Sequence, residues 1–172
     1  MVRVTLLGSA QDGGVPQAGS VHREGLDRRY PVSIGLVDSN GGRHLFDASR
    51  YLAEQLQIWN QTGVDSIFLT HAHIGHVDGL TLFGKEAMNC KGISLFCSNI
   101  MLDLIQKTPI WSIMLDQGVF TPYGNNIVKL PGVTVEALKV PHRAELSDMH
   151  AYIINCLLYT SPSPRDRTRS RM

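Results

Sequence analysis

The chain has 172 residues, of which 43% are hydrophobic and 18% are charged, and its formal net charge is +1. These values describe an ordinary globular protein and provide no overall charge that would attract nucleic acid or a membrane surface. No apolar run approaches the ~20 residues that a bilayer-spanning helix needs. The three cysteines form neither a CxxC pair nor a disulfide framework. We therefore expect a single cytoplasmic domain with no nucleic-acid or membrane partner.

The N-terminal part of the chain alternates apolar runs with turn-forming segments. Residues 2–7 predict a first strand, which a glycine-rich loop at 8–19 follows. The apolar runs at 33–37 and 44–46 flank Ser-Asn-Gly-Gly at 39–42. Because Asn-Gly favours the positive φ angles of tight turns, these two runs predict a β-hairpin.

Helical and extended patterns then alternate through the rest of the chain. Ser49 can cap a helix that continues to about Thr62 and stops at Gly63. The further expected elements are strands at 67–69, 93–97, 127–130, 133–140 and 150–155, and helices at 77–89, 99–107 and 110–115. Paired strands followed by strand–helix alternation indicate a layered α/β fold.

Three histidines lie within six positions in the run Thr-His-Ala-His-Ile-Gly-His at 70–76, directly after a short apolar strand. His71 and His73 are two residues apart, so at a strand end both side chains can reach one ion. Neutral imidazole is the commonest metal ligand near pH 7. The alternative is that these histidines only hydrogen-bond to neighbouring loops, but three together favour a metal site.

The run from Thr70 to His76 resembles the Thr-His-x-His-x-Asp-His signature of the metallo-β-lactamase superfamily. Its context is similar as well, because a Leu-Phe-Asp run ends at Asp47 and a Val-Pro-His run ends at His142. The glycine-rich start at 7–17 is similar to that of the branch that contains the pyrroloquinoline-quinone biosynthesis protein B. The resemblance covers residues 1–155. It implies an αββα sandwich with metals at one edge of its two sheets, of which this chain holds the N-terminal part only.

The resemblance also implies a role for each matching histidine. His71, His73 and His142 match the ligands of a first zinc ion, and three imidazoles leave a fourth position for water. The ion would lower the pKa of that water toward about 7 and supply hydroxide for the hydrolysis of a small-molecule substrate. His76 matches a ligand of a second metal ion.

Gly75 departs from the superfamily signature, which has a metal-binding aspartate at that position. The second site thereby loses a ligand, so we expect one zinc ion rather than two. Asp47 matches a strand-end aspartate that would accept a hydrogen bond from a ligand histidine. Asp78 is a candidate for a supporting acid close to the ligands, with a simple helix-start acid as the alternative.

The leading hypothesis is a zinc-dependent hydrolase that uses metal-bound hydroxide and acts on an unidentified substrate. A non-catalytic metal- or cofactor-binding carrier of the quinone-cofactor type is the alternative, because Gly75 weakens the second site. A nucleic-acid-processing role is disfavoured by the low charge. The backbone amides of Asp12, Gly13 and Gly14 are candidates for contact with a substrate.

The segment 156–172 differs from the rest of the chain because Ser, Pro and Arg dominate it. Residues 156–166 resemble the in-frame translation of a sequencing adapter. We therefore expect 156–172 to be a non-native, disordered read-through tail. A native basic tail and a phosphate-binding arm are the alternatives. On the first interpretation, residues 1–155 form a metallo-β-lactamase-like domain that is incomplete at its C-terminus, so the chain is a fragment.

Overall fold

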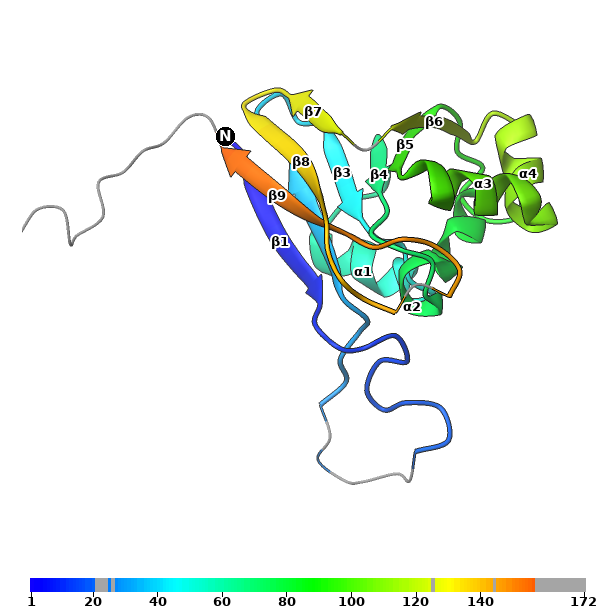
Figure 1. The fold of residues 1–172 in the computed structure, drawn as a ribbon. Coiled ribbons are helices and arrows are strands. Elements are labelled where there is room, and N and C mark those ends of the chain that lie inside the picture. Colours follow the sequence, from blue (N-terminus) through cyan, green and yellow to red (C-terminus); the bar gives the residue numbers. More distant parts are fainter. Residues whose placement is uncertain (21–24, 26, 125, 144, 157–172) are drawn as a thin grey trace, which may run out of the picture.

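The strands of this chain form two sheets that face each other (Figure 1). The computed structural model describes residues 1–20, 25, 27–124, 126–143 and 145–156. The larger sheet has six strands in the order β1-β2-β3-β4-β5-β6, and the smaller sheet has the order β7-β8-β9. Of the tail expected at 156–172, residues 157–172 lie outside the described residues.

The larger sheet begins as an antiparallel meander of β1, β2 and β3 and continues with parallel pairing from β3 to β6. Its strands are β1 (Arg3–Gly8), β2 (Ser33–Val37), β3 (Arg43–Phe46), β4 (Ser66–Phe68), β5 (Ile93–Cys97) and β6 (Phe120–Gly124). The first five confirm the predicted strands. The sequence pattern does not predict β6, because Pro122 and Gly124 are poor strand formers and are tolerated here at a sheet edge.

The smaller sheet and the helices largely follow the predicted segments. The antiparallel strands are β7 (Ile127–Leu130), β8 (Val133–Lys139) and β9 (His150–Cys156). The helices are α1 (Leu52–Trp59), α2 (Ile74–Val77), the 3₁₀ helix η1 (Asp78–Phe83), α3 (Asn99–Lys107) and α4 (Pro109–Asp116). None of these described helices has the length and apolar character needed to cross a membrane.

The prediction of one continuous helix over 77–89 is wrong. The chain instead forms the single turn α2 and then η1, and turns follow Phe83. Gly79 explains why this segment departs from an ordinary helix, since an added Cβ there would lie 2.1 Å from the carbonyl oxygen of Ser49. The amide of Gly79 also donates to the carbonyl of Ala48, at 2.8 Å. Direct backbone packing against the segment before α1 therefore shapes this part of the chain.

Two apolar cores separate the layers of the fold. Ile67 of β4 packs with the helices on one face of the larger sheet, and Phe68 packs under the smaller sheet on the other face. This confirms the prediction that the strand is buried on both sides. Among the described residues no helix packs on the outer face of the smaller sheet, where Ile127 and Ile153 are exposed. The described layers are thus helix, sheet and sheet, three layers of an αββα sandwich.

The strand directions bring several loops to one edge of the sandwich. β1 and β3 both run antiparallel to β2, and β4 runs parallel to β3, so the carboxyl ends of β1, β3 and β4 meet there. The segment between β8 and β9 reaches the same edge beside α2 (Figure 1). Its end is fixed because the His150 amide donates to the carbonyl of Thr70 at 3.0 Å. The Tyr152 hydroxyl donates to the carbonyl of Leu69 at 2.7 Å.

Candidate metal centre

The loop that follows β4 carries three histidines to this edge and is held from two sides. On one side, the amide of Ala48 donates to the carbonyl of His76 at 2.8 Å. On the other side, the amide of Ala72 donates to the buried hydroxyl of Ser147 at 2.9 Å, and this residue lies in the loop between β8 and β9. These bonds fix the backbone of the histidine loop against both sheets.

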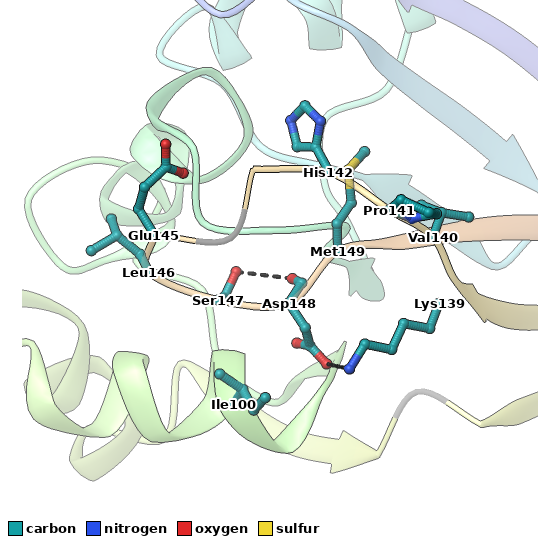
Figure 2. A pocket seen from close by; sticks show the side chains of 10 residues that line it. All are labelled: Ile100, Lys139, Val140, Pro141, His142, Glu145, Leu146, Ser147, Asp148 and Met149. Carbon is teal, nitrogen blue, oxygen red and sulfur yellow. Dashed lines mark hydrogen bonds and ion pairs between the residues drawn. The ribbon is translucent and has the colours of Figure 1, made fainter.

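The structure brings His71, His73 and His142 together, although His142 lies 69 positions or more from the other two in sequence. Each offers one ring nitrogen, and the three nitrogens lie within 4.8 Å of one another. His142 comes from the segment after β8. Its ring points away from the pair formed by Lys139 and Asp148, whose Nζ and Oδ2 are 3.9 Å apart (Figure 2).

His71 has the properties expected of a metal ligand. Its side chain is buried, with 3% of the residue exposed, and within the described part of the chain its Nε2 has no hydrogen-bond partner. Burial, together with the neighbouring His76, His73 and His142, lowers the pKa of His71 to about 4. The ring is therefore neutral near pH 7 and keeps a lone pair available. A buried ring nitrogen that lacks a partner among the described residues, on a histidine grouped with two further imidazoles, fits a bound cation.

His73 is oriented by a residue that the sequence analysis does not single out. Its Nε2 lies 3.2 Å from Oε2 of Glu145. Its other ring nitrogen, Nδ1, lies 3.8 Å from Oδ2 of Asp12. Glu145 is exposed, and its pKa is lowered by backbone hydrogen bonding and by the bond to His73. The position of Glu145 three residues after His142 is the only signal for it in the sequence.

Asp47 organises the base of the site. It follows β3 in the left-handed region at φ 59°, which Asp adopts more readily than most residues. One carboxylate oxygen accepts from the amide of Thr70 at 2.8 Å, and the other lies 2.7 Å from Nδ1 of His76. Burial disfavours the charged form of His76, but Asp47 and then Asp12 outweigh it and raise the pKa of this ring.

We expect the substitution Asp47→Asn to lower the pKa of His76 in the metal-free protein. Asparagine tolerates the left-handed backbone but supplies no negative charge, so the imidazolium loses its main stabilising partner. Titration of the His76 ring by ¹H–¹⁵N NMR measures this change. Asp38→Asn is the matched control, because Asp38 pairs with His44 at 3.1 Å. An unchanged His76 titration in Asp47→Asn would contradict the assigned role.

Asp12 enters the site from the glycine-rich loop after β1. Its Oδ1 lies 3.3 Å from Nε2 of His76, and its Oδ2 lies 3.8 Å from Nδ1 of His73. In the sequence, only the backbone amides of this loop are candidates for contact with a substrate. The amide of Gly14 donates within the loop, to the carbonyl of Gln11 at 2.8 Å, so it is not available for a substrate. The carboxylate of Asp12 therefore reaches two of the histidines, while Gly13 lines the same cleft.

Asp78 lies outside the three-histidine group. Its Oδ2 lies 2.6 Å from a guanidinium nitrogen of Arg50, and the carboxylate starts η1. The alternative described for Asp78, an acid at a helix start, matches this position.

A cleft of about 560 Å³ opens over the histidines. The loop after β1 forms one wall, and Arg143 and Met149 belong to the opposite segment. The cleft is lined by all four predicted metal-site histidines, His71, His73, His76 and His142. A second hollow of about 400 Å³ lies against the same segment between β8 and β9, and Figure 2 shows its lining side chains. The site is thus open to a small molecule.

The comparisons with known structures show that this chain has the metallo-β-lactamase fold. A metallo-β-lactamase from Cronobacter sakazakii superimposes with a TM-score of 0.56 and 15% identity over 90% of this chain and 57% of that one. Zn²⁺-bound PqqB from Methylobacterium extorquens gives 0.70 and 20% identity over 91% and 62%. A diphosphatase of the PhnP family gives 0.67 and 20% identity over 90% and 63%. The chain spans about six-tenths of the length of these structures.

Sequence comparison adds one partial match. Over 84 residues the chain is 33% identical to an octanoyltransferase from Porphyromonas gingivalis, which covers 46% of this chain and 17% of that protein. Most of the octanoyltransferase therefore lies outside the match. No protein-family profile matches the chain.

Proposed function

We propose that this chain forms the metal-binding part of a zinc-dependent hydrolase that acts on a small anionic substrate. The observation that carries the proposal is the buried Nε2 of His71, which has no hydrogen-bond partner among the described residues, in a group of three imidazoles that lines an open cleft. Zn²⁺ bound to PqqB, a protein of the same fold, supports the choice of metal. When bound by three imidazoles, zinc lowers the pKa of a coordinated water toward about 7 and supplies a nucleophile near neutral pH.

The residues around the cleft support a small anion as the substrate. Arg143 lines the cleft, and its Nε lies 3.5 Å from Oε1 of Glu145. Because the side chain is exposed, its guanidinium can turn toward a ligand. A guanidinium binds phosphate or carboxylate oxygens through paired hydrogen bonds. The similarity to a diphosphatase fold also favours a phosphate-containing compound.

A hydrolysis assay with metal-free and zinc-reloaded protein tests this proposal. We expect zinc-dependent turnover of bis(p-nitrophenyl) phosphate or p-nitrophenyl phosphate, with p-nitrophenyl octanoate as the neutral ester for comparison. Arg143→Ala should raise KM for the anionic substrates more than for the ester, because it removes charge and not the metal site. Zinc binding without turnover of any of these substrates would contradict the hydrolase proposal.

That contradicting result would instead support a non-catalytic metal- or cofactor-binding protein. Gly75 is the observation in favour of this second candidate, because it cannot contribute a ligand at the position where the superfamily signature has an aspartate. The two candidates share the three-histidine site and differ only in turnover.

A further inference from the structure

We propose that Asp12 replaces the aspartate that is absent at position 75, so that its carboxylate and Nε2 of His76 hold a second divalent cation beside the three-histidine site. This inference rests on the proposed function only in requiring a metal at His71, His73 and His142. It changes the expectation of a single ion, which follows in part from the lack of a ligand at Gly75.

The Asp12 carboxylate is placed between two histidines. Its two oxygens face different histidines, Oδ1 toward His76 at 3.3 Å and Oδ2 toward His73 at 3.8 Å. The carboxylate thus lies between a member of the three-histidine group and the histidine outside it. Carboxylate oxygen is a common zinc ligand, with Zn–O distances of about 2.0–2.2 Å.

The lack of a side chain at Gly75 allows this carboxylate to reach the site. A Cβ added to Gly75 would lie 2.4 Å from Cα of Asp12 and 2.8 Å from its carbonyl oxygen. Both are backbone atoms, so a side chain at position 75 would force the loop after β1 away from α2. Asp12 can therefore enter the site only because position 75 has no side chain. Compared with the superfamily signature, α2 lacks an acid at position 75, and the loop after β1 provides one at position 12.

His76 is oriented so that one ring nitrogen is directed toward Asp12. Its Nδ1 is held by Asp47 at 2.7 Å, which leaves Nε2 directed toward Asp12. A ligand histidine with its other nitrogen bonded to a carboxylate is the usual arrangement in metal sites. The rings of His76 and His71 are 4.2 Å apart between centroids, so this site adjoins the first. A cation there also neutralises the two carboxylates that flank His76.

Titration of the metal-free, full-length chain with Co²⁺ tests the inference, with bound cobalt counted by elemental analysis and followed by visible absorption. We expect about two equivalents for the unchanged chain and about one for Asp12→Asn, which keeps the shape of the side chain and removes its charge. Asp116→Asn, on α4, is the control and should bind as the unchanged chain does. Two tightly bound ions in Asp12→Asn would overturn the inference.

A second measurement does not depend on any variant folding well. In the unchanged chain labelled with ¹⁵N-histidine, addition of a second equivalent of Zn²⁺ should shift the Nε2 resonance of His76 while the first equivalent shifts that of His71. A His76 resonance that stays unchanged through both equivalents would overturn the inference. One bound ion with the signature of His71 would also overturn it and leave the three-histidine site standing, whereas no bound ion would refute the proposed function itself.

Discussion

The substitution His71→Ala is expected to abolish tight zinc binding and all zinc-dependent hydrolysis. His71 is the most buried of the three clustered histidines, and its Nε2 has no protein partner within the described residues. Its loss leaves two imidazoles, one of which belongs to the exposed residue His142. Loss of a partner that merely orients a ligand costs about 10–100-fold in metal affinity, so loss of the ligand itself should cost at least about 100-fold.

His150→Ala is the matched control for this substitution. His150 begins β9 at the same edge and also has a buried ring nitrogen, Nδ1, without a partner among the described residues, but it lies outside the three-histidine group. Isothermal titration of zinc into the metal-free proteins provides the comparison. We expect a large loss of zinc affinity for His71→Ala and a small change for His150→Ala, and equal losses for both would contradict a ligand role for His71.

Gly75→Asp restores the aspartate of the superfamily signature and is nevertheless expected to damage this protein. The new Cβ would meet the backbone of Asp12 at 2.4 Å, so either the loop after β1 or α2 must move. Such overpacking costs about 1–3 kcal/mol or more in the free energy of unfolding. The displaced loop also carries the Asp12 carboxylate away from His76.

Thermal and urea unfolding measure this effect, with Gly124→Asp as the control. Gly124 lies at the end of β6, where an added Cβ meets nothing within 4 Å, so the same side chain should be tolerated. Gly75→Ala separates size from charge and should also destabilise the protein. Full stability together with increased metal binding in Gly75→Asp would refute the assigned packing between α2 and the loop after β1.

The strands were the most predictable part of the fold because their apolar patterns are local. The run at 67–69 indicates a strand buried on both faces, and Ile67 and Phe68 do pack into different cores. β6 lacks such a pattern, since its residues after Phe120 are exposed and include a proline. The helix expected over 77–89 fails for a different reason. Its geometry depends on contact between Gly79 and the distant backbone of Ser49, which no periodicity reveals.

Some residues of the candidate site can be predicted from local sequence, and others only from contacts between distant segments. The spacing of His71 and His73 is visible in sequence, and the similarity to a superfamily signature adds His142. Asp12 and Glu145 carry no motif of their own, because each acts through a loop that only the folded sheets bring to the histidines. The glycine at position 75 was the available signal for Asp12. Because the signature aspartate is absent at position 75, a carboxylate from another segment is needed to complete the same set of ligands.

X-ray absorption spectroscopy at the zinc edge of the protein loaded with one equivalent of Zn²⁺ identifies the atoms that bind the metal. We expect nitrogen and oxygen neighbours at about 2.0–2.1 Å, with the outer-shell scattering of about three imidazoles. The same measurement on His71→Ala should lose that pattern. Zinc coordinated by sulfur at about 2.3 Å, or by oxygen atoms without imidazole scattering, would contradict a metal centre at His71, His73 and His142.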